Sequence, residues 1–171
     1  MNSFPKQEVL DVCAQYGPRL RVPAGLDARR VMAAIAQVES GLGGNCGPRH
    51  EPAYDTGGKV WNQSPAQRQL VARWKSDGAS SFGPWQMMLP NCQGHTPAEM
   101  RSDLDVCALL FVSQFNLYVI GLRNAQTLAE IGEVWNMGHI APDPEYVAKL
   151  QAAYDGLAVG DGEQHVASEV L

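Results

Sequence analysis

One carboxylate of this chain, Glu39, stands where an apolar helical pattern ends. Apolar residues recur at Val31, Ala34, Ile35 and Val38, the spacing of one buried helical face, and Glu39 follows directly. Glycines come next and open space beside it. A carboxyl group at the edge of a core is partly desolvated, which raises its pKa and keeps a proton near neutral pH for use as a general acid. The alternative is a solvated carboxylate in a frayed last turn.

Three short motifs follow one another along the chain: Glu39-Ser40, Gly83-Pro84-Trp85-Gln86 and Trp135-Asn136-Met137-Gly138. In this order they resemble the three signatures of the lytic transglycosylases, a family related to goose-type lysozymes. The family patterns are Glu-Ser, Gly-Leu-Met-Gln and Ala-Tyr-Asn-x-Gly. Tyr146-Val147 is similar to the Tyr-Val pair that the family places after its third signature. The resemblance covers roughly residues 27–154 and implies a mainly α, lysozyme-like single domain with a substrate cleft.

The resemblance also implies an activity on peptidoglycan glycan strands. Glu39 matches the family's catalytic Glu, which protonates the leaving oxygen between N-acetylmuramic acid and N-acetylglucosamine. The same group then takes the proton from the 6-hydroxyl of the muramic acid, which attacks its own anomeric carbon and closes a 1,6-anhydro ring. One carboxylate is enough, because the nucleophile belongs to the substrate. We expect neither a cofactor nor a metal.

The matched positions imply a set of substrate-binding residues. Gln86 and Asn136 would line the cleft, where their amides hydrogen-bond sugar hydroxyls and acetamido groups; the alternative is helix-end capping. Ser40 would hold Glu39 or the substrate, or make a local backbone hydrogen bond. Tyr146 would donate its hydroxyl to Glu39, or lie in the core.

Two tryptophans depart from the family pattern. Trp85 follows Pro84 where the family has Leu-Met, and Trp135 replaces the usual Tyr. Each tryptophan is able to stack on a sugar face or to pack in the core.

Asp77 leaves a second catalytic mechanism open. It lies nine residues before Gln86, a spacing that resembles the position of one acidic residue in goose-type lysozymes. A second carboxylate across the cleft would activate water and give an inverting muramidase, if the two carboxyl groups are roughly 6.5–9.5 Å apart. The alternative is an exposed residue in a polar turn. A further acidic residue of goose-type enzymes is replaced here by Met88, and we favour transglycosylation.

The loop predicted over residues 45–63 is rich in Gly, Pro, Asn and Asp and has no sustained period. A loop of this length in a compact domain is more often functional than idle. Its residues able to contact a sugar subsite or a peptide stem are Arg49, His50, Glu51, Tyr54 and Trp61.

Four potential zinc ligands, Cys46, His50, Cys92 and His95, form the best alternative constellation. The two cysteines among them lie in predicted loops and are also the better candidates for a disulfide. The sequence leaves the pairing with Cys13 and Cys107 open. A glycan-binding module without catalysis and a helical scaffold are two further hypotheses.

Composition limits the partners. The chain has 171 residues, of which 13 are basic and 18 acidic, and its net charge of −5 without a basic run argues against nucleic acid. We judge the apolar stretch 106–122 too short and polar to span a bilayer, and expect a core helix, no membrane insertion and a monomer. The resemblance implies action in the periplasm, the cell wall or outside the cell. The first residues lack the pattern of a secretory signal, so delivery by a phage particle, by lysis or by a secretion machine is as open as ordinary export.

The expected elements are about seven helical segments and no strand pair. An N-terminal helix and linker, 1–26, would pack on a catalytic domain, 27–158, and 159–171 would be a loose tail. Ser64, Thr96, Thr127 and Asp143 have the pattern of helix N-caps, as does Asp27. The helices are expected at residues 7–16, 28–40, 65–75, 97–123 with a break near 101–103, 128–137 and 144–154.

Overall fold

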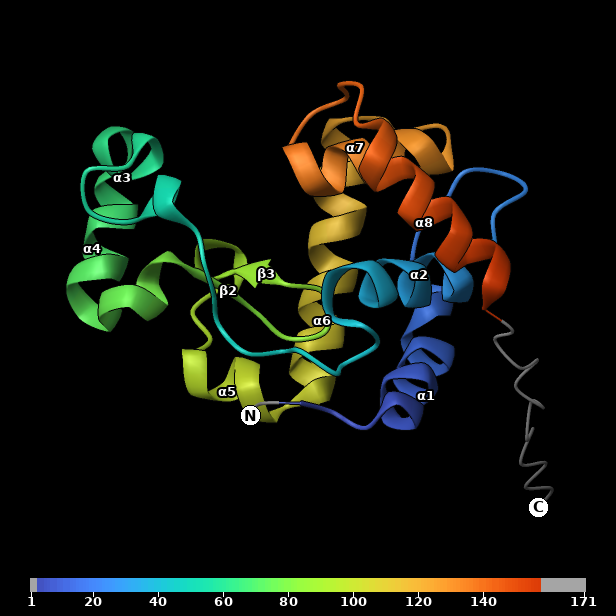
Figure 1. Ribbon diagram of the computed structural model, residues 1–171, viewed down its shortest axis with the longest axis horizontal. Helices are drawn as coiled ribbons and strands as arrows, with labels where there is room; N and C mark the ends of the chain where they lie inside the picture. Colours follow the sequence, from blue (N-terminus) through green and yellow to red (C-terminus); the bar gives the residue numbers. More distant parts are fainter. Residues whose placement is uncertain (1–2, 158–171) are drawn as a thin grey trace, which may run out of the picture.

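Helices make up most of residues 3–157, the part of the chain that this computed structural model describes (Figure 1). The mainly α class is therefore confirmed, whereas the predicted tail 159–171 lies outside the described residues. The α-helices are α1 Lys6–Tyr16, α2 Ala28–Ser40, α3 Lys59–Gln63, α4 Pro65–Trp74, α5 Pro97–Ser102, α6 Leu104–Gln114, α7 Leu128–Met137 and α8 Pro144–Gly156. The short 3₁₀ helices are η1 Gly17–Arg19, η2 Pro52–Tyr54, η3 Lys75–Ala79 and η4 Leu89–Asn91, and η5 Phe115–Leu122 is a π-helix.

Helix starts follow the predicted caps. The side chain of Asp27 accepts the backbone N–H groups of Arg29 and Arg30 at 2.8 and 3.1 Å. Thr96 and Glu99 form a complete reciprocal capping box. The side chains that cap α4, α7 and α8 each accept the N–H three residues on, and they belong to Ser64, Thr127 and Asp143. Such caps satisfy donors that the first helical turn leaves free, so the local sequence identifies them.

The prediction of no strand pair was wrong. Strands β1 Arg49–His50, β2 Ser80–Phe82 and β3 Met87–Met88 form an antiparallel sheet in the order β1-β2-β3. Ser81 lies opposite Arg49 on one side and Met88 on the other. Strands of two or three residues are too short to show an alternating pattern, so they cannot be recognised from the sequence.

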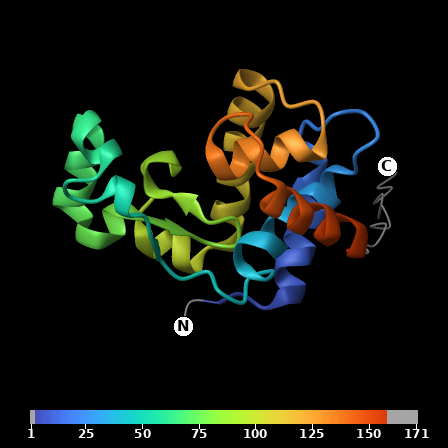
Figure 2. The ribbon, with the colours of Figure 1, turned by 45° about the horizontal axis from the view of Figure 1, so that its top comes forward.

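The predicted loop at 45–63 also contains more structure than expected. It holds β1, η2 and the five-residue helix α3, so the described residues form eight α-helices instead of about seven. No side chain caps the start of α3, and a helix this short has no readable period. Helices α3 and α4 lie on one side of the sheet, and α1, α2, α7 and α8 lie on the other (Figure 1; Figure 2).

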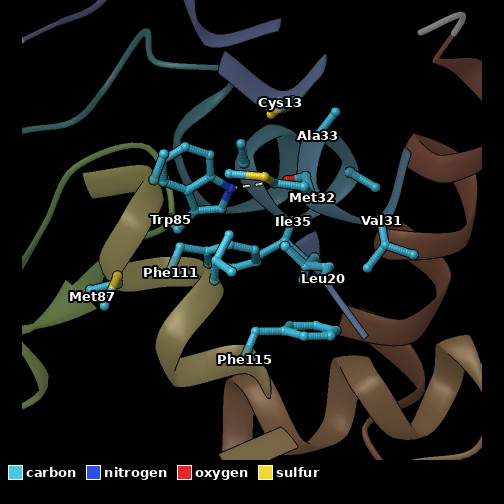
Figure 3. Packing of buried hydrophobic residues seen from close by; sticks show 14 of the residues in the cluster. Cys13, Leu20, Val31, Met32, Ala33, Ile35, Trp85, Met87, Phe111 and Phe115 are labelled. Carbon is cyan, nitrogen blue, oxygen red and sulfur yellow. Dashed lines mark hydrogen bonds between the residues drawn. The ribbon is translucent and has the colours of Figure 1, made fainter. Parts of the chain in front are cut away.

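Helix α2 runs through the core rather than along its edge. Every residue from 31 to 36 is fully buried, so the helix is covered on all sides over this stretch and not on one face only. Trp85 lies beside it and donates its indole N–H to the carbonyl oxygen of Met32 at 3.0 Å (Figure 3). Phe111 and Phe115 belong to the same cluster. This packing fixes the end of α2, and with it Glu39.

The apolar stretch forms one continuous helix, Leu104–Leu122, of 19 residues with a mean hydropathy of 1.6. This helix is long and apolar enough for a membrane span by length and composition alone, so the prediction that the stretch is too short and polar for one is wrong. Phe111 nevertheless lies in the core, and Asn116 binds the backbone of Arg19 and Arg21 at 2.8 and 2.7 Å. Only 39% of the most apolar window is buried, and Leu117 and Leu122 are exposed, so the prediction of a core helix is borne out only in part.

Candidate functional site

A pocket of about 440 Å³ opens beside the C-terminal end of α2. Its walls come from α2, the sheet with its connecting turns, η2, η4, the end of α6, η5 and α7. Four of the sequence-predicted site residues line it together: Glu39, Gln86, Trp135 and Asn136. The other lining residues are Arg49, Glu51, Tyr54, Ser81, Met87, Met88, Asn91, Gln114, Tyr118, Val134, Met137 and Gly138.

Glu39 is held at the last turn of α2. Gly41 follows in a left-handed conformation, with φ 63°, and ends the helix. The Glu39 side chain is only 5% exposed. Its Oε1 accepts a hydrogen bond of 2.7 Å from the hydroxyl of Tyr146, and its Oε2 accepts one of 3.1 Å from Nη1 of Arg49. Both carboxyl oxygens therefore have a partner, one from α8 and one from β1.

The pKa of Glu39 is raised above its ordinary value, because burial penalises the charged form. The hydrogen bonds from Tyr146 and Arg49 oppose that rise, and the nearby charge of Glu51 adds to it. Burial is the largest of these causes. The carboxyl group therefore holds its proton to a higher pH than a solvated glutamate, as a general acid requires.

Tyr146 reaches Glu39 because α7 and α8 approach closely at Gly132. A Cβ at this position would lie 2.9 Å from Cδ2 of Leu150 and 3.3 Å from Cδ1 of Tyr146. Burial, followed by the charge of Glu39, raises the pKa of the Tyr146 hydroxyl. The hydroxyl therefore stays protonated and acts as the donor to Glu39.

Arg49 bridges two carboxylates at the pocket. Besides its bond to Glu39, its Nε donates to Oε1 of Glu51 at 3.0 Å. The side chains of Arg49 and Glu51 are 53% and 32% exposed. The sequence placed both residues in a candidate contact loop, but nothing in it indicated that Arg49 reaches Glu39.

Gln86 is held in the turn between β2 and β3 with φ 46°, an uncommon conformation for a residue other than glycine. Its Oε1 accepts from the hydroxyl of Ser81 at 3.0 Å, and its Nε2 donates to the carbonyl of Gly83 at 3.0 Å. The side chain is buried at the pocket wall with its amide fixed. Backbone strain retained at a pocket is typical of a functional site.

Trp135 and Asn136 lie at the end of α7, where Gly138 caps the helix with φ 77°. The Trp135 ring packs on Phe111, with centroids 4.8 Å apart, and also lines the pocket. The amide of Asn136 donates to Oδ2 of Asp143 at 2.6 Å. Asn136 thus lies at the pocket while its amide joins α7 to the N-cap of α8.

Three predicted site residues lie elsewhere. Trp85 is 1% exposed and stacked on Phe111, so the structure corrects the sugar-stacking hypothesis in favour of the core. Ser40 makes local backbone hydrogen bonds instead of holding Glu39: its hydroxyl donates to the carbonyl of Ala36 and accepts from the N–H of Gly43. Asp77 lies in η3, paired with Arg101 at 2.6 Å, and does not line the pocket.

The described residues form neither the zinc site nor the disulfide that the sequence left open. Cys46 and Cys92 are free and buried, and so are the other two cysteines. His50 pairs with Asp55 and His95 with Glu99. Within residues 3–157, no three His, Cys, Asp or Glu side chains come together as metal ligands. The two loop cysteines, the better candidates for a disulfide, are therefore not paired.

Sequence reasoning left Tyr118 out of the site. It projects into the pocket from the π-helix η5, and its hydroxyl donates to the carbonyl of Gly138 at 2.7 Å. π-Helical turns often occur at functional sites, but the sequence carries no signal for one.

Comparisons with protein-family models, with curated proteins and with solved structures found no match to this chain. The chemistry of the pocket therefore has to be inferred from its own residues and from the order of the three motifs.

Proposed function

We propose that this protein is a lytic transglycosylase with a lysozyme-like fold, which cleaves peptidoglycan between N-acetylmuramic acid and N-acetylglucosamine. The observation that carries the proposal is the buried carboxyl group of Glu39, 5% exposed, with a raised pKa and on the wall of a polar pocket. The amides of Gln86 and Asn136 and the ring of Trp135 supply polar and stacking contacts of the kind that sugars use. The protein would act on the cell wall, reached by export or from a phage particle.

The reaction balances without water. The proton of Glu39 goes to the glycosidic oxygen as the bond from that oxygen to the anomeric carbon of the muramic acid breaks. The 6-hydroxyl oxygen of the same sugar bonds to that carbon, and its proton returns to the Glu39 carboxylate. The products are a 1,6-anhydro end and a free 4-hydroxyl on N-acetylglucosamine. This sequence of steps needs neither a cofactor nor a metal.

Hydrolysis is the second candidate, because Glu51 provides another carboxylate on the pocket wall. A carboxylate there is able to activate a water molecule against the sugar. Asp77, the carboxylate favoured by the sequence for this role, pairs with Arg101 outside the pocket lining. Mass spectrometry of the digest distinguishes the two reactions, since transglycosylation leaves 1,6-anhydro ends and hydrolysis leaves reducing ends.

Glu39→Gln tests the proposal directly. We expect it to reduce the clearing of purified cell walls by at least about a hundredfold, which is the lower range for a lost general acid. The matched control is Glu145→Gln, which removes an exposed carboxylate paired with Lys149 on α8. Equal clearing by the parent and Glu39→Gln would remove Glu39 from the mechanism. Binding to cell walls without clearing by the parent would instead indicate a glycan-binding module.

A further inference from the structure

Arg49 and Glu39 both line the pocket, and the guanidinium of Arg49 lies against the Glu39 carboxyl group. It binds Oε2 of Glu39 at 3.1 Å, whereas Tyr146 binds the other oxygen at 2.7 Å. Arg49 lines the pocket and Tyr146 does not, so Arg49 lies on the pocket side of the carboxyl group. A general acid has to present its proton to the leaving oxygen, and a guanidinium at that place both blocks the approach and favours the ionised form.

The contact between Arg49 and Glu39 is built so that it can open. The Arg49 side chain is 53% exposed and comes from a two-residue edge strand, while Glu39 is 5% exposed and fixed in the core helix. Glu51 holds Nε of Arg49 at 3.0 Å, so the arginine keeps one anchor when it leaves Glu39. The exposed arginine is therefore the partner that can move, while Glu39 stays in place.

We propose that Arg49 is a specificity-determining residue, which recognises a carboxylate of the substrate's peptide stem and leaves Glu39 when it binds that carboxylate. The inference rests on the proposed function and names the charged feature of the substrate that this site selects. Guanidinium groups bind carboxylates with two parallel hydrogen bonds, which favours an acidic peptide over an uncharged glycan. Binding of the correct substrate thus uncovers the acid.

The charged and titratable groups that act on Glu39 are Tyr146 from α8, Arg49 from β1 and Glu51 beside it. Their effects support the release of Arg49 on substrate binding. With Arg49 withdrawn, Glu39 loses a positive charge that lowers its pKa, and the substrate carboxylate adds a negative charge near Glu51. Both changes favour the protonated form of Glu39.

The test compares two forms of one substrate. Soluble peptidoglycan fragments are used untreated, or after their stem carboxylates have been converted to amides with carbodiimide and ammonia. We expect the parent to cleave the untreated form roughly three- to tenfold faster in kcat/KM, and Arg49→Gln to cleave both forms equally. Arg49→Lys keeps the charge without the planar fork and should restore part of the preference. The control is Arg73→Gln, an arginine over Trp74 on α4, outside the pocket lining.

The dependence of the kinetics on pH is a second measurement. A merely structural role of Arg49 would leave it unchanged. Arg49 lowers the pKa of Glu39 in the free protein, so Arg49→Gln should shift the alkaline limb of kcat/KM to higher pH. The limb of kcat, measured with substrate bound, should stay in place because Arg49 has already left Glu39.

The outcomes separate the two proposals. If Glu39→Gln abolishes cleavage but the parent treats both substrate forms equally, the role of Arg49 is wrong and the proposed function stands. The same holds if Arg49→Gln keeps the parent's preference. If the parent cleaves neither form, the proposed function fails, and with it the recognition step. Calorimetry of Glu39→Gln with the two fragment pools tests recognition without cleavage, and equal affinities would overturn it.

Discussion

The hydroxyl of Tyr146 lies 2.7 Å from Oε1 of Glu39 and joins two residues that are 107 positions apart in the chain. This bond holds the carboxyl group on the side away from Arg49. It also stabilises the ionised form, so it opposes the effect of burial on the Glu39 pKa.

Tyr146→Phe should shift the alkaline limb of kcat/KM to higher pH, because a bond that lowers the Glu39 pKa is lost. Cleavage at the optimum should fall roughly tenfold, since the acid loses a fixed partner. Tyr154→Phe on the same helix is the control, because its hydroxyl accepts from the backbone of Asp27 instead. A pH limb that moves in both variants, or in neither, would contradict this role.

Glu39→Gln should make stability less dependent on pH. The folded protein holds the Glu39 proton more tightly than the unfolded chain, whose pKa is near the ordinary 4.5. The stabilisation is complete below that value and is lost as pH rises through the higher folded-state pKa. Urea unfolding from pH 4 to 8 should therefore show a smaller decline in the free energy of unfolding for Glu39→Gln. Parallel curves for the two proteins would refute the raised pKa.

At position 86, glycine should be at least as stable as alanine. Both substitutions remove the amide bonds to Ser81 and Gly83. Glycine alone accepts φ 46° without strain, which is worth about 1–2 kcal/mol. In ordinary positions alanine is the more stable by roughly 0.5–1 kcal/mol. Denaturant midpoints of Gln86→Gly and Gln86→Ala measure the order, and a clear advantage for alanine would count against the strained turn.

The two tryptophans should separate stability from function. Trp85→Phe removes the indole hydrogen bond to the carbonyl of Met32 and part of a buried ring, and should cost about 1–3 kcal/mol of unfolding free energy, with activity retained per folded molecule. Trp135→Ala removes an aromatic face from the pocket and should lower kcat/KM about three- to tenfold. Unfolding curves and kinetics on both variants decide the assignment, which the opposite pattern would overturn.

Asp77→Asn tests the hydrolytic mechanism. Because Asp77 pairs with Arg101 and does not line the pocket, we expect a loss of at most about 1 kcal/mol in stability. Cleavage should change less than about twofold, far below the effect of a lost catalytic group. Mass spectrometry should still find anhydro ends. A hundredfold loss of activity would make Asp77 the second carboxylate after all.

Features encoded within a few neighbouring residues could be predicted from the sequence. The caps at Asp27 and Asp143 are of this kind, since the side chain binds backbone two or three residues away. The placement of Glu39 at the end of α2 was likewise predictable from one helical period and the glycines that follow.

Features that depend on distant contacts were not predictable. The sheet brings Arg49 beside Ser81, and only then does the guanidinium reach Glu39. The burial of Trp85 depends on Met32 and Phe111, far away in sequence. Because the pocket is formed by such contacts, the sequence named Arg49 only as a candidate contact in a loop, without its bond to Glu39, and left out Tyr118.

The missing side chain at Gly132 sets the spacing on which the acid depends. Glycine within a helix sacrifices roughly 0.5–1 kcal/mol relative to alanine, so α7 is weaker there than it needs to be. The glycine allows α8 to approach closely enough for Tyr146 to reach Glu39, whereas the methyl group of an alanine would lie 3.3 Å from the phenol ring. A single absent carbon, at the contact between α7 and the ring of Tyr146, thus affects the acidity of a residue almost a hundred positions earlier.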